Sequence, residues 1–510
     1  MTVDPTINDP RQRRVILLAV SLALLAVISS VSGLNVAQPQ LARDLGASQS
    51  DVLWMINLYT ITLAALLLPL GAAGDRWGRK PVLITGLVAF GAASVVAGFS
   101  PSTEVMLAAR LLSGVGAAMI MPVTLAVITT TFPPEERSKA IGVWTAVSGA
   151  GSILGMFVSA LLVDVASWRW LFLLPVVLVL VALPLVLWAI PNFRVPSRHP
   201  FDLVGALASM IAMFAFIFAL TEGPQQGWSA PVTLVGLVVG VAGAFGFVVW
   251  ERRYRAPLLD VRLFRHLGLA SGSVSLIAVF GVPTGILVVL YLFLQVVVGW
   301  SGLVSTLALM PMLVLMILCS VLAPRLEARI GTRLTMAVGL LLCVAGLALM
   351  AALVSADGGY LSILPGYVVL GLGMGLSMTP STEAITSSLP REEQGVASAL
   401  NDIAREFGSA LGVALLGAVL AVGYSNAINL HLDGVPPNAA DAARKGIASV
   451  LAIAGDAQPY SKTLFRSAQQ AFVGGWQQAM GTGAVVMVLV FVYVLVRGPS
   501  STNAHPSGGK

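Results

Sequence analysis

Fourteen long apolar stretches dominate the sequence, and each is long enough to cross a lipid bilayer. A transmembrane helix needs about 20 predominantly apolar residues, and a backbone in lipid must satisfy its hydrogen bonds internally. The stretches are Val15–Val36, Val52–Ala72, Val82–Phe99, Val105–Thr129, Ala140–Val163, Trp170–Ile190, Leu203–Leu220, Thr233–Trp250, Leu269–Val298, Leu303–Leu322, Leu334–Val354, Ile363–Thr379, Val396–Val422 and Ala479–Val496. Only 10% of the residues are charged, against about a quarter in soluble proteins. The sequence therefore predicts an all-α membrane protein with fourteen transmembrane helices.

Basic residues are distributed unevenly between the loops that join these predicted helices. With the N-terminus placed in the cytoplasm, the cytoplasmic loops contain Arg76, Arg79, Lys80, Arg137, Lys139, Arg194, Arg198, Arg252, Arg253, Arg255, Arg262, Arg265, Arg325, Arg329 and Arg333. The short outer loops contain little beyond Arg43 and Arg169. Cytoplasmic loops of membrane proteins carry an excess of Lys and Arg. The formal net charge of +6 thus indicates topology rather than nucleic-acid binding, and both termini are predicted to lie in the cytoplasm.

The sequence contains an internal repeat. Pro133, Glu135, Glu136, Ala140, Gly151, Ser152, Leu154 and Gly155 recur at one constant offset as Pro390, Glu392, Glu393, Ala397, Gly408, Ser409, Leu411 and Gly412. Many secondary transporters are built from such repeats and bind substrate at the interface between them. The repeat predicts two six-helix halves with two helices between them. The predicted parts are an N-terminal segment (1–14), an N-terminal half (15–190), a linker with helices seven and eight (191–268), a C-terminal half (269–497) and a disordered tail (498–510). The long outer loop 423–478 is predicted to be either a structured hairpin or a mobile flap.

The stretch Leu400–Gly412 carries three charges inside an apolar segment. Asp402 and Glu406 are four residues apart and share one face of a helix, and Arg405 lies beside that face. Each charge near the centre of a bilayer costs about 2.5–3.5 kcal/mol on insertion scales. These side chains should therefore face a water-filled cavity or an ionic partner, which makes them candidates for proton coupling and cation binding. The alternative is a shallow helix in which Arg405 neutralises both acids locally.

A short glycine-rich and basic segment, Gly71–Lys80, follows the second predicted helix. It resembles the loop between helices two and three of the major facilitator superfamily, in which an aspartate and an arginine latch the two halves on the cytoplasmic side. The resemblance gives this role to Asp75 and Arg76. Gly71 and Gly78 would permit close packing, and Arg79 belongs to the same cationic turn. A simple anchor to the inner face is the alternative.

Arg110 lies early in the fourth predicted helix among Leu, Ala and Gly residues. A guanidinium cannot lose its proton, so a buried arginine needs an acceptor. Arg110 resembles the fourth-helix arginine that the family links to proton relay, although Ser113 replaces the usual glutamine. The alternative is a side chain that extends to the outer surface.

Three glycines of the fifth predicted helix, Gly142, Gly151 and Gly155, match part of the antiporter signature of drug exporters. Met156 stands where that signature has a proline, and Ser159 with Ala160 replaces a glycine pair. Small residues allow close helix approach, which suits a hinge or a seal. Gly408 and Gly412 occupy the repeated positions and are predicted to act similarly. Ordinary helix packing is the alternative.

The resemblance extends to the fourteen-helix drug:proton antiporters. The thirteenth helix of quaternary-ammonium efflux pumps has acids at the positions of Asp402 and Glu406. Ser30 stands where such pumps usually have an aspartate, and Asn57 stands where some have an acid. The residues predicted to line a substrate cavity are Ser30, Asn35, Trp54, Asn57, Tyr59, Met121, Trp144, Asn401 and Phe407. Aromatic and methionine side chains among them would offer a pliable surface and cation–π faces, and packing within the bundle is the alternative.

These observations predict a bacterial, multi-pass exporter in the cytoplasmic membrane. It would exchange inward-moving protons for hydrophobic, cationic small molecules such as antiseptics, dyes and antibiotics. No phosphate-binding loop for ATP is present in the sequence, so the proton gradient is the expected energy source, with no cofactor, no metal and no enzymatic activity. The resemblance implies a monomer. Alternatives are an exporter of one metabolite or self-made antibiotic, an uncoupled facilitator, and a membrane receptor that transports nothing.

Overall fold

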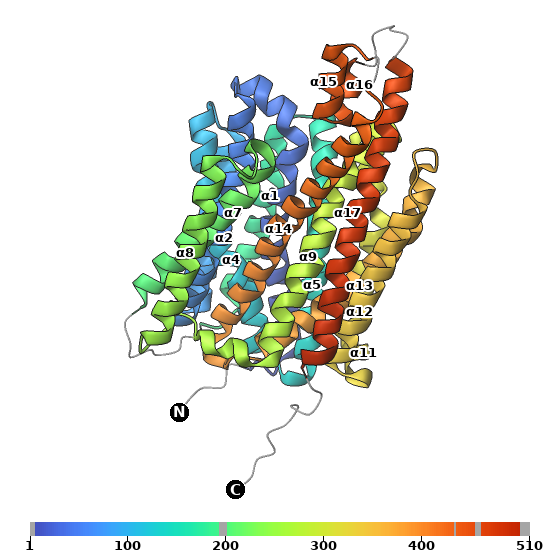
Figure 1. Ribbon diagram of the computed structural model, residues 1–510. Helices are drawn as coiled ribbons and strands as arrows, with labels where there is room; N and C mark the ends of the chain where they lie inside the picture. Colours follow the sequence, from blue (N-terminus) through green and yellow to red (C-terminus); the bar gives the residue numbers. More distant parts are fainter. Residues whose placement is uncertain (1–5, 193–200, 433–434, 454–460, 500–510) are drawn as a thin grey trace.

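Long helices running roughly side by side form the whole architecture (Figure 1). The computed structural model describes residues 6–192, 201–432, 435–453 and 461–499. The helices are α1 (Pro10–Leu45), α2 (Gln49–Trp77), α3 (Arg79–Gly98), α4 (Thr103–Thr131), α5 (Pro134–Val165), α6 (Leu173–Ala189), α7 (Leu203–Gln226), α8 (Pro231–Arg253), α9 (Leu267–Leu292), α10 (Gly302–Leu307), α11 (Met310–Ile330), α12 (Thr332–Leu353), α13 (Gly359–Thr386), α14 (Gln394–Asn429), α15 (Pro437–Lys445), α16 (Ile447–Ile453) and α17 (Ser461–Arg497). Short helical turns join some of them: η1 (Trp168–Phe172), η2 (Val261–Arg265), η3 (Phe293–Val297) and η4 (Arg391–Glu393).

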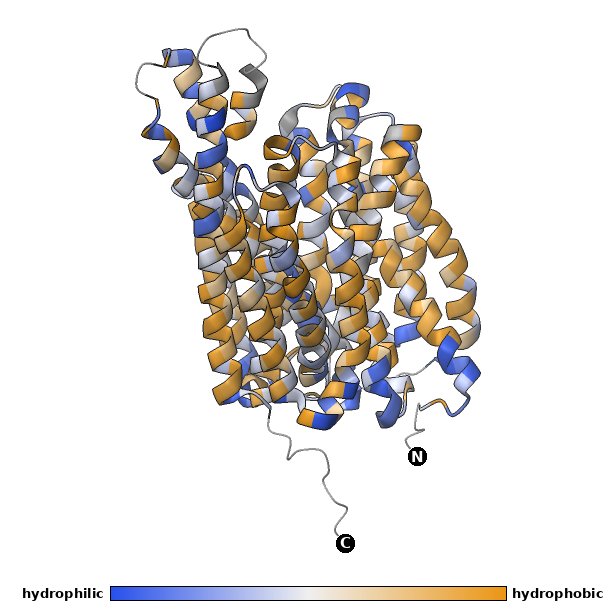
Figure 2. Ribbon diagram, turned by 90° about the vertical axis from the view of Figure 1, so that its right-hand side faces the viewer, coloured by the Kyte–Doolittle hydropathy of each residue, from blue (hydrophilic) through white to orange (hydrophobic). Residues whose placement is uncertain are grey.

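The predicted number of membrane spans is confirmed. Within the described residues, 14 helical segments are long and apolar enough to cross a bilayer. One span, Gly302–Ile330, combines α10 with α11, and Pro311 in the first turn of α11 lacks the N–H needed to continue the preceding helix. Figure 2 shows a hydrophobic band between two more hydrophilic ends. On α8, the large apolar side chains Val235, Val238 and Phe245 are exposed, as expected for a lipid-facing helix.

Both ends of the described chain lie on one side of the bundle, where α1 begins and α17 ends (Figure 1). We name this side the terminal end and the opposite side the distal end. One buried apolar cluster is built from α1 to α6. A second is built from α9 to α17, with Ile153 of α5 added to it. Each set of helices therefore has a core of its own.

A helical hairpin stands above the distal end (Figure 1). α14 has 36 residues and α17 has 37. At 1.5 Å per residue each is about 54 Å long, which exceeds the roughly 30 Å of bilayer hydrocarbon. α15 and α16 connect their projecting ends, and the Tyr424 hydroxyl donates to the Ala443 carbonyl at 2.9 Å. The described part of the predicted loop 423–478 is thus helical, whereas residues 433–434 and 454–460 lie outside the described residues. The predicted disordered tail lies outside them from residue 500 onward.

Candidate functional site

The charged residues of α14 lie in the middle of the bundle. Asp402 follows the first residue of α14 by eight positions and Glu406 by twelve, which places them about 12 and 18 Å along the helix. The Asp402 side chain is fully buried, and Arg405 is 6% exposed. Glu406 is half-buried. The helix therefore presents one of its two acids to an open space and keeps the other inside the protein.

Arg405 is held by a buried ion pair and by two aromatic rings. Its Nη1 lies 3.5 Å from Oδ1 of Asp402. The guanidinium carbon lies 4.5 Å from the ring centre of Phe280 and 5.4 Å from that of Trp144. Guanidinium groups are attracted to aromatic faces at such distances. The positive charge of Arg405 is thus neutralised within the protein wall by a partner behind it.

A short polar chain supports this pair from α13. The Thr382 hydroxyl donates to the Asn401 side-chain carbonyl at 2.9 Å, and the Asn401 amide donates to Asp402 Oδ1 at 3.2 Å. The second carboxylate oxygen of Asp402 has no hydrogen-bond partner among the described residues. Buried polar groups are normally satisfied, so this oxygen is an exception within the pair.

A cavity of about 490 Å³ lies between the two sets of helices. Helices α1, α2, α4, α5, α7, α9, α11, α13 and α14 contribute to its wall. Its polar lining residues are Asn57, Thr60, Ser148, Ser152, Thr221, Gln225, Thr284, Tyr367, Arg405, Glu406 and Ser409. Its apolar lining includes Met121, Phe280, Met312, Met316 and Met374. Glu406 is the only acid on this wall within the described part of the chain. Its carboxylate makes no hydrogen bond there and no ion pair within 4 Å, and the neighbouring Arg405 interacts with it electrostatically at longer range.

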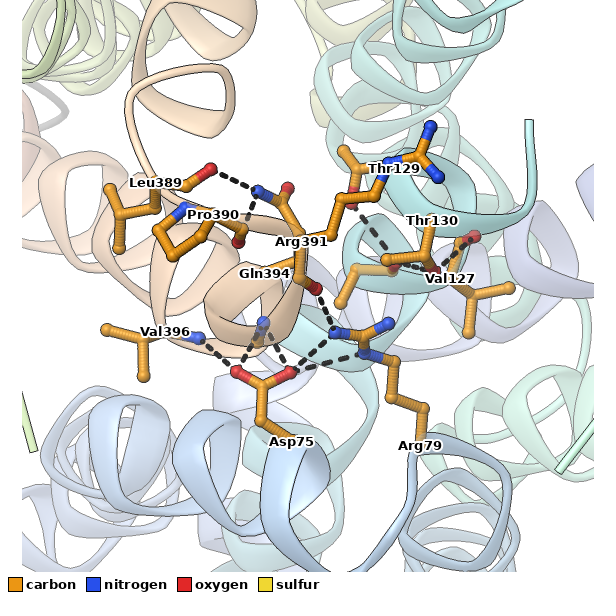
Figure 3. Close-up of polar contacts among 12 residues, drawn as sticks. Asp75, Arg79, Val127, Thr129, Thr130, Leu389, Pro390, Arg391, Gln394 and Val396 are labelled. Atoms are coloured by element: carbon orange, nitrogen blue, oxygen red, sulfur yellow. Dashed lines mark hydrogen bonds and ion pairs between the residues drawn. The ribbon is translucent and has the colours of Figure 1, made fainter. Parts of the chain in front are cut away.

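The terminal end of the cavity is closed by a latch between α2 and α14 (Figure 3). The Asp75 carboxylate accepts the backbone N–H groups of Gly395 at 2.7 Å and Val396 at 3.1 Å. It also accepts Arg79 Nη2 at 2.8 Å, and the same nitrogen donates to the Arg391 carbonyl at 3.0 Å. The first N–H groups of a helix have no partner within the helix and favour negative charge. Asp75 therefore caps α14 from the other set of helices.

A second seal joins α5 to α13. Ser138 Oγ donates to Glu383 at 2.6 Å, and the hydroxyls of Thr145 and Thr379 are 2.8 Å apart. The lining of the cavity, by contrast, reaches Pro224 and Gln225 near the distal end of α7. The cavity therefore extends from the middle of the bundle toward the distal end only.

Comparison with known proteins agrees with this two-part, gated architecture. The family model described as Major Facilitator Superfamily matches residues 20–413. The chain belongs to the Major Facilitator Superfamily. It is 32% identical to the multidrug efflux pump LfrA of Mycolicibacterium smegmatis, over 97% of each chain. It is 31% identical to the multidrug resistance protein Stp of Mycobacterium tuberculosis, over 84% of this chain and 80% of the relative. The human organic anion transporter MFSD10 has a similar fold, with a TM-score of 0.59 at 16% identity, covering 96% of this chain and 100% of that one.

Membership in this superfamily makes the protein a transporter. The latch fits such a protein, because an alternating-access transporter must close one end of its cavity while the other is open. The resemblance assigned the latch to Asp75 and Arg76. In the structure the cation that binds Asp75 is Arg79, and Arg76 is half-buried nearby. Gly78, with φ +106°, ends α2 and turns the chain so that Arg79 returns to Asp75.

Arg110 is buried in the N-terminal half of this superfamily member. It is 1% exposed, so it does not extend to the outer surface. Its Nε donates to the Met55 carbonyl at 2.9 Å, and its Nη1 donates to Ser30 Oγ at 3.2 Å. The guanidinium lies 4.3 Å from the Tyr59 ring centre. No carboxylate pairs with Arg110 among the described residues, and Arg110 does not line the cavity.

The predicted cavity residues divide into two groups. Asn57 and Met121 line the cavity. The others do not: Ser30 binds Arg110, Tyr59 and Trp144 are packed in the core, Asn401 is buried behind Asp402, Trp54 contacts Phe218 and Phe407 contacts Phe216. Asn35 lies in α1, but its side chain is outside the described part of the structure. Large aromatic side chains pack in a bundle wherever space allows, so residue type alone does not separate lining from core.

The predicted gating glycines also occupy two environments. A Cβ at Gly71 would lie 2.6 Å from the Gly395 carbonyl, and one at Gly142 would lie 2.9 Å from the Ser320 carbonyl. Both therefore sit where the two sets of helices meet at the terminal end. Apart from Gly78, which turns the chain after α2, the other four pack within one set: Gly151 and Gly155 against α1, and Gly408 and Gly412 against α9.

Several lining residues were absent from the sequence prediction. They come from α7, α11 and α13 and include Thr221, Gln225, Met312, Met316 and Tyr367. The α7 residues follow a helical stripe, which is a visible signal. A stripe alone does not tell whether it faces a cavity or another helix.

Proposed function

We propose that this protein is a proton-driven exporter of hydrophobic cations, broad in range, in a bacterial cytoplasmic membrane. The observation that carries the proposal is the charge of the cavity wall. Arg405 forms its ion pair with Asp402, and Glu406 remains on the cavity wall as a carboxylate with no ion pair within 4 Å among the described residues. An apolar cavity with one exposed negative charge favours an apolar cation.

The shape and chemistry of the lining support a broad substrate range. Methionine side chains are flexible and polarisable, and promiscuous binding surfaces use them often. Met121, Met312, Met316 and Met374 line the cavity together with Phe280. LfrA and Stp are named as a multidrug efflux pump and a multidrug resistance protein, which supports a broad substrate range for this chain as well.

The proposed mechanism is competition between a proton and the cation for Glu406. When the cavity is open to the outside, a proton binds Glu406 and removes the charge that holds the cation. When the cavity is open to the cytoplasm, loss of that proton restores the cation site. Each proton that enters along the membrane potential supplies about 2.3 kcal/mol per 100 mV. The proton gradient is then the only energy source that the cycle needs.

The terminal end corresponds to the cytoplasmic face in this proposal. Arg76, Arg79 and Lys80 lie there, in accord with the excess of cations in cytoplasmic loops. The structure then has its cavity closed to the cytoplasm by Asp75 and extended toward the outside. The working unit is proposed to be a monomer surrounded by lipid, because each chain contains a complete cavity. Its partners are protons and small hydrophobic cations.

Export of a single metabolite and uncoupled flux are the competing functions. Ser30 and Asn57 are uncharged, so the N-terminal half places no acid near the cavity. This half therefore offers neither a site for multivalent cations nor a second proton site. A narrow substrate profile would support the first alternative. Flux that does not depend on the pH gradient would support uncoupled transport.

Ethidium efflux from energised cells tests the proposal. Cells with the wild-type protein, Glu406→Gln or Glu136→Gln are loaded with ethidium, and efflux is followed with and without an uncoupler. Glu136 pairs with Arg13 at 2.9 Å, away from the cavity, so its variant is the matched control. We expect uncoupler-sensitive efflux that Glu406→Gln abolishes and Glu136→Gln preserves. Efflux that is equal in all three proteins would overturn the assignment of Glu406.

A further inference from the structure

Helix α7 is positioned between the two six-helix sets rather than outside them. In the distal half of α7, Ile217 packs in a buried cluster with Ile61 and Ala64 of α2. The ring of Phe218 lies 5.9 Å from the ring of Trp54, which also belongs to α2. α7 is therefore attached to the first set of helices along its distal half.

The same part of α7 also contacts the second set. The ring of Phe216 meets that of Phe407 on α14 edge-on, at 5.9 Å between centres. Phe407 is the residue next to Glu406, so α7 reaches the level of the candidate proton site. At this level α7 therefore lies between α2 and α14 and contacts both (Figure 1).

One face of α7 is a wall of the cavity. Its lining residues are Ile217, Leu220, Thr221, Pro224 and Gln225, a spacing of three and four residues that places them on one helical face. α8 packs against another face, where a Cβ at Gly240 would lie 2.9 Å from the Phe216 ring. No residue of α8 lines the cavity within the described ranges. α7 thus forms a wall of the cavity, and α8 supports α7.

The polar groups of this wall are placed toward the cavity mouth. The Thr221 hydroxyl donates to the Ile217 carbonyl at 2.7 Å, which leaves its lone pairs available to a ligand. Gln225 is exposed, and its amide makes no hydrogen bond to any described residue. Leu220 is 8% exposed and contributes an apolar surface one turn below. A cation that leaves the cavity therefore passes first the apolar side chain of Leu220 and then the amide of Gln225.

We propose that α7 selects substrates: Leu220, Thr221 and Gln225 set the size and shape of the cation that the outward-extended cavity accepts and direct its exit to water rather than sideways into lipid. This inference rests on the proposed export function. It assigns a role in specificity to the helix pair between the two halves. It assigns no role in proton coupling, because the α7 lining contains no titratable group.

Export of two cations of different size tests the proposal. Rates for ethidium and for the larger rhodamine 6G are measured with the wild-type protein, Leu220→Trp and the control Ile211→Trp, whose side chain is 51% exposed on α7 and does not line the cavity. We expect Leu220→Trp to change the ratio of the two rates by about tenfold, the discrimination that pocket shape commonly provides. The control should keep the wild-type ratio. A wild-type protein that exports neither cation would contradict the proposed function, whereas an active protein whose ratio Leu220→Trp leaves unchanged would overturn the role of α7.

Thiol labelling gives a second readout that does not depend on export. Thr221→Cys and Ile211→Cys are made in a background in which Cys319 and Cys343 are serine. A membrane-impermeant maleimide, applied from outside, should label Cys at position 221, and tetraphenylphosphonium should slow that reaction. Position 211 should stay unreactive. Absence of labelling at position 221, or labelling that tetraphenylphosphonium does not slow, would overturn the proposal even where Leu220→Trp fails to fold.

Discussion

The Arg405 guanidinium lies 3.5 Å from the Asp402 carboxylate, three residues earlier on α14, and both groups are buried. Glu406, the next residue after Arg405, lines the cavity and makes no ion pair within 4 Å among the described residues. Two neighbouring acids on one helix thus have different environments. The first balances a charge inside the protein, and the second remains free to bind a cation or a proton.

The buried pair makes a prediction about paired substitutions. Removing one partner of a buried ion pair commonly costs about 3–5 kcal/mol, whereas replacing both can be nearly neutral. We expect Asp402→Asn to lower ethidium export strongly, because it leaves the Arg405 charge uncompensated beside the cation site. Asp402→Asn combined with Arg405→Gln should recover part of the rate. Initial efflux rates, normalised to the amount of protein in the membrane, measure this coupling. A double variant in which the two substitutions lower the efflux rate additively would contradict this coupling between Asp402 and Arg405.

The latch predicts that Asp75 holds the terminal end closed. Hydrogen bonds to charged groups contribute about 1.5–3 kcal/mol each, and Asp75 accepts the N–H groups of both Gly395 and Val396. Asp75→Ala should therefore shift the population toward the state open at the terminal end. Spin labels on cysteines at Trp77 and Glu392 would report longer distances. Glu136→Gln, which changes an ion pair within one half, should leave the distances as in the wild type.

Close packing at the latch predicts a difference between two glycines. A Cβ at Gly71 would meet the Gly395 carbonyl at 2.6 Å and the Ala399 Cβ at 2.8 Å, whereas one at Gly417 would meet nothing within 4 Å. Gly71→Ala should slow export several-fold because the terminal end closes poorly, and Gly417→Ala should be close to wild type. Efflux rates and the same spin-label distances check this. Equal rates in the two variants would show that the contact at Gly71 does not limit the cycle.

Arg110 predicts an effect on stability. Its hydrogen bonds to Met55 and Ser30 and its contact with Tyr59 are all buried. Arg110→Ala removes this packing and should cost about 2–5 kcal/mol, as large-to-small core changes do. Ser30→Ala removes one bond and should cost about 1 kcal/mol. Melting temperatures of the detergent-purified proteins, with the exposed Arg253→Ala as control, measure both. An Arg110→Ala variant as stable as the control would contradict this role.

The sequence predicted the features that depend on composition along one helix. The fourteen spans follow from apolar length, and the location of Asp402, Arg405 and Glu406 inside the bundle follows from the cost of charge in lipid. The position of Asp75 and Gly71 at the terminal-end contact also agrees with the family resemblance. Each of these features is local or is carried by a motif.

Features that depend on how helices pack could not be predicted in the same way. Tyr59 and Trp144 have the side chains of a drug pocket, but neighbouring helices bury both. Arg79 binds Asp75 because Gly78 turns the chain between the end of α2 and Arg79. The stripe Leu220–Gln225 faces the cavity only because α7 lies between α2 and α14. No single-helix pattern contains that information.

Proton-coupled export through Glu406 is the central claim, and reconstituted vesicles test it most directly. Wild-type protein and Glu406→Gln are placed in liposomes, and uptake of tetraphenylphosphonium is driven by an imposed pH gradient with the membrane potential clamped. We predict gradient-dependent uptake by the wild type, accompanied by proton movement in the opposite direction, and neither by Glu406→Gln. Gradient-dependent uptake by Glu406→Gln, at the wild-type rate and with the same proton movement, would contradict the account.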